Sequence, residues 1–177
     1  PEALREIVGA LWKEDSVCAM AIVFGALTAG RANEYLGGRW DEIDLDEKTF
    51  SVPQARRKDK KPYPHVVPLS RQLLRLLERL DTSGDYIFQG KGKAAVYSCT
   101  VLRAIKRASG RDDMTLHGMR STFSDWCAKN EKNFLVSEKQ LMHAVGNAVF
   151  QAYQRDDLLE QRRVLMQEWA DFLLPNV

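Results

Sequence analysis

Apolar residues recur along most of this chain at the three- and four-residue spacing of amphipathic helices. The first segment, residues 2–12, places Leu4, Ile7, Val8 and Leu11 on one face. A more continuous apolar run follows at residues 16–29, and its length and lack of proline indicate a buried helix. The same reasoning predicts a short helix at 32–38 and longer ones at 70–80, about 94–109, 117–130, 137–144 and 157–173.

Several predicted helices carry recognisable end signals. Ser16 and Ser70 stand directly before helical segments, where a hydroxyl can accept a hydrogen bond from a free backbone N–H. The sequence SEKQ at 137–140 has the capping-box pattern and predicts that a helix begins there. Gly37 and Gly38 are expected to end the short helix.

One region alternates in the manner of strands. The segments KTFSV (48–52) and HVVPL (65–69) flank a polar, basic stretch that contains Pro62 and Pro64, which predicts a hairpin with a long tip. A brief extended piece is expected at YIF (86–88). The chain is therefore predicted to be mainly α with a small antiparallel β-sheet, an α+β fold.

Length and composition indicate one globular domain. The 177 residues suffice for a single core, and no apolar run approaches the roughly 20 residues that a membrane-spanning helix needs. Because the chain opens directly on the helical pattern PEALREIVGALW, we expect residues 1–177 to be the C-terminal part of a longer protein. Its three cysteines are far apart, without metal-ligand spacing, and are expected to be reduced thiols in a cytoplasm.

The net charge of +2 is less informative about a ligand than the distribution of the charges along the chain. Basic residues cluster at 55–61, 90–93 and 103–111, whereas 41–47 is acidic. Clustered lysine and arginine can form an electrostatic footprint for phosphates, although such runs are also common on solvated surfaces.

Polar residues stand at places where a plain helical fold does not need them. Arg31 follows a glycine directly after the buried apolar helix, and Glu34 lies one turn further on. His117 and Arg120 are three residues apart at the start of another predicted helix, so they share a face. Side chains of these types at a helix N-terminus are well suited to binding a phosphate.

Three further positions belong to the same pattern. His143 is expected on the apolar side of a short helix before a Gly-Asn break, and Tyr153 follows among polar residues. Lys58 lies in the basic tip of the hairpin. Each of these residues alone has an ordinary explanation as core or surface. It is their order along the chain that indicates a shared function.

In this order the segments resemble the catalytic domain of tyrosine recombinases, and most closely that of prophage integrases. The segments that carry the likeness are LTAGRANEYLGGRWDEIDL, the lysine-bearing hairpin ARRKDKKPYPHVVPLS, HGMRSTFSDW and MHAVGNAVFQAYQRDD. The resemblance as a whole spans roughly residues 15–175. The resemblance implies a site-specific DNA recombinase that cleaves and rejoins DNA for prophage or genomic-island integration and excision.

The resemblance also assigns roles to individual residues. The arginines would bind the phosphodiester, Tyr153 would attack phosphorus, and the hairpin lysine would protonate the departing 5′-oxygen. Lys60 and Lys61 remain alternatives to Lys58, because the hairpin tip is longer than is usual in the family. The residues assigned to catalysis are Arg31, Lys58, His117, Arg120, His143 and Tyr153.

The implied reaction keeps the bond energy in a 3′-phosphotyrosine, so it needs no ATP, metal or other cofactor. The implied partners are double-stranded DNA and three further copies of the protein in a homo-tetramer on DNA, whereas the isolated fragment is expected to be a monomer. The implied location is the bacterial cytoplasm, in association with the nucleoid. The tail after residue 157 carries enough apolar surface to pack on its own domain or on a neighbouring protomer.

Three other functional interpretations agree with parts of the pattern. A type IB topoisomerase uses the same residue types, but the HGMRSTFSDW and AYQR segments favour an integrase. A DNA-binding module that has lost catalysis is disfavoured because all six expected side chains are present. An unrelated helical interaction protein would have to match every segment by chance.

Overall fold

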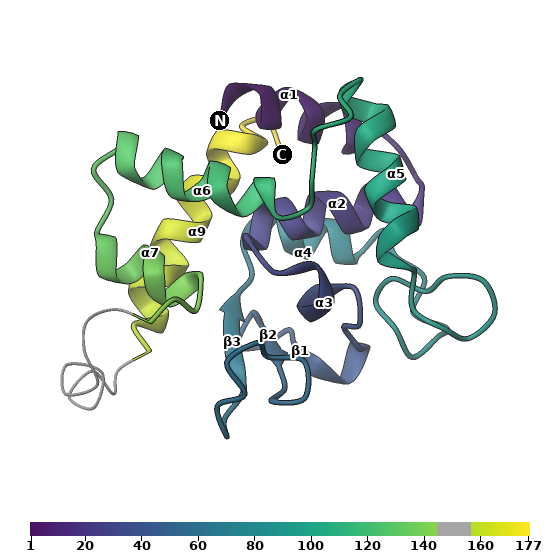
Figure 1. The fold of residues 1–177 in the computed structure, drawn as a ribbon. Coiled ribbons are helices and arrows are strands. Elements are labelled where there is room, and N and C mark those ends of the chain that lie inside the picture. The colour runs from purple at the N-terminus through teal and green to yellow at the C-terminus, as the bar shows by residue number, and fades with distance from the viewer. Residues whose placement is uncertain (145–156) are drawn as a thin grey trace.

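A computed structural model describes residues 1–144 and 157–177 of the chain. The described part is mainly helical with one small antiparallel sheet, which confirms the predicted fold class. In chain order the elements are α1 (Glu2–Leu11), α2 (Val17–Thr28), α3 (Ala32–Tyr35), η1 (Trp40–Glu42), β1 (Ile43–Asp44), β2 (Thr49–Val52), β3 (His65–Pro68), α4 (Arg71–Leu77), α5 (Ser98–Ser109), α6 (Gly118–Lys129), α7 (Phe134–Gln140) and α9 (Leu159–Leu173) (Figure 1).

Helix α2 forms the centre of the helical part and contacts α1, α3, α4, α5, α6 and α9 (Figure 1). Every residue from Ala19 to Thr28 is buried, which is why this segment has no polar face. The hydroxyl of Ser16 accepts a hydrogen bond from the N–H of Ala19 at 3.1 Å, as predicted for its N-cap. The helix ends at Ala29, whose φ of +49° turns the chain sharply toward α3.

The sheet has three strands in the order β1-β2-β3, all antiparallel. Strands β2 and β3 form the predicted hairpin, in which Phe50 lies opposite Val67 and Val52 lies opposite His65. Strand β1 was not predicted, because it has only two residues and lies within the acidic segment, where no apolar alternation marks it. The hairpin therefore gains a third strand on its β2 side.

Two aromatic clusters hold the elements around the site. In the first, the ring of Phe24 on α2 lies 5.3 Å from Phe88 and 5.6 Å from Phe50 on β2, which fixes the sheet against α2. In the second, Trp169 on α9 lies 5.1 Å from Trp126 on α6. Such edge-to-face and tilted pairs each add about 0.5–1.5 kcal/mol beyond their buried area.

Helix α9 packs within its own chain, against α1, α2, α4, α7 and β3 (Figure 1). The indole N–H of Trp169 donates to the carbonyl of Ala26 on α2 at 2.8 Å. The apolar face that the sequence left without an assigned partner is thus covered by the domain itself. Its buried apolar residues are Leu165, Met166, Trp169, Ala170 and Leu173.

The predicted start of the helix at 137–144 is wrong. Helix α7 begins at Phe134, because the side chain of Asn133 caps it by accepting hydrogen bonds from the N–H groups of Leu135 and Val136. Ser137, the expected cap, lies inside the helix and donates its hydroxyl to the carbonyl of Phe134 at 2.8 Å. An asparagine is an equally strong cap, and the earlier start brings one more apolar turn into the helix.

Other helix boundaries also differ from their predicted positions. Helix α5 begins at Ser98 instead of near residue 94, because Ala95 forms an isolated β-bridge with Gln89. Helix α4 ends three residues before its predicted end. The extended piece expected at 86–88 is present in part, since Tyr86 forms an antiparallel bridge with Arg39.

Candidate functional site

Arg31 is placed by the turn between α2 and α3. It occupies the N-cap position of α3 in an extended conformation, and its backbone N–H donates to Glu34 Oε2 at 3.2 Å. Its guanidinium Nη1 lies 3.3 Å from Glu34 Oε1. Because the Glu34 side chain is only 4% exposed, this carboxylate orients Arg31 from the buried side while the arginine remains open at its other face.

Arg120 on α6 is held by two backbone carbonyls from distant segments. Nη1 donates to the carbonyl of Ala29, at the end of α2, and Nη2 donates to the carbonyl of Leu141, after α7, at 2.7 Å. Its Nε is buried and has no hydrogen-bond acceptor among the described residues. Burial, and then the charge of Arg31, lower the pKa of Arg120 to about 10, which leaves it protonated at neutral pH.

The basic tip of the hairpin divides into structural arginines and exposed lysines. Arg56 forms a two-point ion pair with Glu42 and donates from Nε to the carbonyl of Glu34 at 3.2 Å, which ties the tip to α3. Arg57 is 3% exposed and donates to both carboxylate oxygens of Asp59, at 2.8 and 2.7 Å. These contacts neutralise part of the basic run and brace the loop.

Lys58 directly follows these anchored arginines and is exposed on the rim of the adjoining cleft. It makes no hydrogen bond or ion pair within the described part of the chain. The two alternatives are engaged locally, since Lys60 donates to the carbonyl of Ala55 at 2.7 Å and the Lys61 ammonium lies 6.0 Å from the ring of Tyr63. This difference favours Lys58 as the lysine that can meet a ligand.

These side chains line one cleft of about 650 Å³ between α3, the hairpin tip and the start of α6. His117 lies at the N-cap position of α6, where the sequence placed it, and is exposed. The N–H of Gly118 donates to Thr115 Oγ1 at 2.9 Å, which closes the turn before the helix. The charged and imidazole side chains on the walls are Arg31, Glu34, Arg56, Arg57, Lys58, Lys60, His117 and Arg120.

A second hollow of about 210 Å³ adjoins the first and shares His117 and Arg120 with it. His143 lines this second hollow, and its Nε2 lies 3.5 Å from Arg120 Nη2. The helical position expected for His143 is wrong, because α7 ends at Gln140 and His143 follows the helix end. At this position beyond the helix end, the ring of His143 faces Arg120.

The two hollows thus bring together Arg31, Lys58, His117, Arg120 and His143, five of the six residues singled out in the sequence. Tyr153, the sixth, lies outside the described residues. The wall is rich in positive charge and in N–H donors. Chemically, such an arrangement binds an anion that carries several oxygens, as a phosphodiester does.

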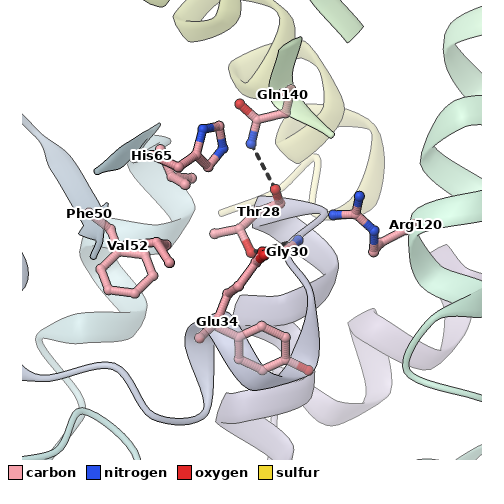
Figure 2. A pocket seen from close by; sticks show the side chains of 10 residues that line it. Thr28, Gly30, Glu34, Phe50, Val52, His65, Arg120 and Gln140 are labelled. Atoms are coloured by element: carbon pink, nitrogen blue, oxygen red, sulfur yellow. Dashed lines mark hydrogen bonds between the residues drawn. The ribbon is translucent and has the colours of Figure 1, made fainter. Parts of the chain in front are cut away.

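A buried polar network that sequence reasoning missed lies behind the cleft (Figure 2). Gln140 Nε2 donates to the carbonyl of Thr28 at 2.8 Å, and Arg162 Nη1 donates to Gln140 Oε1 at 3.1 Å. His65 faces the same small cavity, where burial and the charge of Arg162 lower its pKa to about 3. No pattern in the sequence marked this network, because Gln140 stands in the polar run SEKQ, where it was assigned to a capping box.

Across residues 1–144 and 157–177, no group of three or more His, Cys, Asp or Glu side chains is arranged to hold a metal ion. No described helix combines the length and the apolar character needed to cross a membrane.

Comparison with known proteins places the chain among integrases. It is 40% identical over 154 residues to the prophage integrase IntA of Escherichia coli (strain K12), covering 83% of this chain and 36% of that protein. It is 33% identical over 197 residues to the integrase of Enterobacteria phage P4, covering 99% of this chain and 44% of that protein. The chain therefore spans less than half the length of these relatives.

Two solved structures have a similar fold. The integrase from mycobacterium phage Brujita matches with a TM-score of 0.70 and 18% identity, covering 98% of this chain and 57% of that one. The XerA recombinase matches with a TM-score of 0.64 and 22% identity, covering 90% and 60%. At these identities the likeness concerns the fold.

The profile of the phage integrase family matches residues 3–159, which is most of the chain and includes every segment on which the sequence resemblance was based. The chain belongs to the phage integrase family.

Proposed function

We propose that this chain is the catalytic domain of a site-specific recombinase, which cleaves and rejoins DNA through a 3′-phosphotyrosine at Tyr153 during prophage or genomic-island integration and excision. The observation that carries the proposal is the cleft. Arg31, Lys58, His117 and Arg120 come from three separate segments, the start of α3, the hairpin tip and the start of α6, and all line one hollow. Membership in the phage integrase family supports the same function.

The two arginines are assigned to the scissile phosphate. A phosphodiester gains charge on its non-bridging oxygens in the transition state, and donors that are already fixed stabilise that charge most effectively. Arg31 is braced by Glu34, and Arg120 by the carbonyls of Ala29 and Leu141. By analogy with the loss of one oxyanion donor, removing either arginine should slow cleavage roughly 10²–10³-fold.

The remaining groups are assigned to proton transfer. The Tyr153 hydroxyl attacks phosphorus to form a P–O bond, and its proton passes to His117 acting as base. The bond from phosphorus to the 5′-oxygen breaks, and Lys58 gives that oxygen a proton. His143 completes the donors around the phosphate. A 5′-hydroxyl from a second duplex then reverses these steps and exchanges strands, so the ester supplies the energy for rejoining.

The proposed partners follow from this chemistry. The substrate is double-stranded DNA, and exchange between two duplexes needs four active sites, which we assign to a homo-tetramer on DNA. Because energy is stored in the phosphotyrosine ester, the proposed reaction needs neither ATP nor a metal. Its place of action would be the bacterial nucleoid.

Trapping of the covalent intermediate tests the proposal. The full-length protein is incubated with a nicked attachment-site duplex from which the cleaved fragment diffuses away, and adducts stable to SDS are measured. Wild type and the control Tyr97→Phe, at a tyrosine that is 70% exposed, should form the adduct, and Tyr153→Phe should not. If wild type binds its site without forming an adduct, the catalytic assignment fails and a DNA-binding module without catalysis takes its place.

A further inference from the structure

The end of helix α7 brings two polar side chains together. The N–H of Met142 donates to the carbonyl of Lys139 at 3.1 Å, and the N–H of His143 donates to the carbonyl of Glu138 at 2.9 Å. Met142 has a φ of +51°, so the chain folds back on the last turn of the helix. This pair of bonds is the Schellman arrangement, which places His143 beside the residue five positions before it.

At helix ends of this kind the two neighbouring side chains frequently make an apolar contact. Here they are Glu138 and His143, and Glu138 Oε2 lies 3.0 Å from His143 Nδ1. The Glu138 side chain is 15% exposed, whereas that of His143 is 43% exposed. The sheltered carboxylate therefore holds an imidazole that would otherwise be free to rotate.

We propose that Glu138 is a positioning residue, which fixes His143 in the tautomer that carries its proton on Nδ1 and turns Nε2 toward Arg120 in the cleft. A carboxylate oxygen accepts hydrogen bonds, so the nitrogen that meets it must be the N–H nitrogen. The opposite nitrogen then faces the second hollow, 3.5 Å from Arg120 Nη2.

The consequence for chemistry depends on the proposed function. A ring whose plane is set before DNA binds presents Nε2 at a defined position beside Arg120. In the imidazolium form, which carries a proton on both nitrogens, Nε2 donates to the phosphate while Nδ1 still donates to Glu138. Partners that orient metal-binding imidazoles are typically worth 10- to 100-fold in activity, and we take the same range by analogy. We therefore expect Glu138→Ala to lower the rate of adduct formation 10- to 100-fold without changing the affinity for the DNA site.

The tautomer itself is measured without DNA. The chain has only three histidines, so the ring nitrogens of His143 can be assigned in ¹⁵N spectra by comparison with His65→Gln and His117→Gln. At a pH of about 8.5, where free imidazole is neutral, wild type should show a protonated Nδ1 and an unprotonated Nε2. Glu138→Ala should shift both nitrogens toward the average of the two tautomers. Glu160→Ala, at an acidic side chain that is 78% exposed, should leave them unchanged.

The conservative variant separates positioning from general structural damage. In Glu138→Gln the amide oxygen can still accept from Nδ1, so both the tautomer and the rate should lie nearer to wild type than in Glu138→Ala. In a His143→Ala background, Glu138→Ala should cause no further loss of rate, because the residue acts through His143.

The two possible failures are distinguishable. A protonated Nε2 in wild type, or identical ring shifts in wild type and Glu138→Ala, overturns the positioning role whatever the enzyme does. Failure of wild type to form an adduct overturns the proposed function, and the ring shifts then still decide whether Glu138 orients His143.

Discussion

Arg162 allows a sharp test of how the domain is held together. Its side chain is fully buried, and Nη1 donates to the carbonyl of Val66 on β3 at 2.7 Å and to Gln140 Oε1 at 3.1 Å. Nε donates to the carbonyl of Asp157 at 2.9 Å, and Nη2 pairs with the Asp157 carboxylate. One guanidinium thus joins the hairpin, the end of α7 and the chain before α9.

The cost of Arg162→Met follows from these contacts. Methionine keeps most of the alkyl volume, so the lost stability comes chiefly from two buried acceptors, the carbonyl of Val66 and the side-chain oxygen of Gln140. Each of these acceptors loses its donor, which costs about 1–3 kcal/mol. The Asp157 side chain is 51% exposed, so water can replace its partner and the ion pair adds little. We expect a loss of about 3 kcal/mol, or roughly 6–12 °C in melting temperature for a domain of this size.

Urea unfolding, followed by tryptophan fluorescence and by circular dichroism, measures this loss. The control is Arg163→Met, the same change at the next position of α9, where the arginine pairs with Glu160 and is 26% exposed. It should cost less than about 1 kcal/mol. Equal losses in the two variants would refute the argument that buried acceptors, and not removal of a charge, determine the cost.

Three further predictions follow from single residues. Arg120→Lys should slow adduct formation roughly 10²–10³-fold, because one ammonium cannot reach the carbonyls of Ala29 and Leu141 and also hold a phosphate; a rate within threefold of wild type would contradict this. The pKa of His65 is lowered to about 3 in the folded state, so the unfolded chain binds the extra proton and stability falls as the pH drops below about 6.5. At pH 4.5 the loss should reach about 2–3 kcal/mol in urea titrations, and His65→Gln should remove that part of the pH dependence. Lys48 is exposed with a φ of +52°, so Lys48→Gly should raise the free energy of unfolding by about 0.5–1 kcal/mol, and a lower urea midpoint would show that the lysine side chain is needed.

Much of the secondary structure could be predicted because its signals are local. The N-caps of Ser16 and Ser70 each satisfy a backbone N–H within three residues, and both predictions are confirmed. The hairpin was predicted from alternation within its own strands and is also confirmed. The predicted start of α7 was wrong because Asn133 and Ser137 are both residue types that cap helix N-termini. Packing of the apolar turn between them decides which of the two caps the helix.

The candidate site was predictable only as a set of residue types. The order of Arg31, His117 and Arg120 along the chain identified the family, and these residues do line one cleft. Their catalytic roles, and that of Tyr153, stay predictions. Nothing local indicated that Arg120 would be fixed by carbonyls at residues 29 and 141, since each of those bonds joins segments more than 20 residues apart.

The sequence by itself therefore determined the helical class, the hairpin, the family and the residues worth testing, because periodicity, caps and motifs act over short spans of chain. Only the tertiary structure decided which charges are free. Arg56 and Arg57 are neutralised by Glu42 and Asp59, while Lys58, which follows them directly in the chain, stays open to the cleft. It also decided that Glu138 meets His143. Partner choice for a charged side chain depends on burial and on distances of a few ångströms across the fold, and a linear pattern does not contain those quantities.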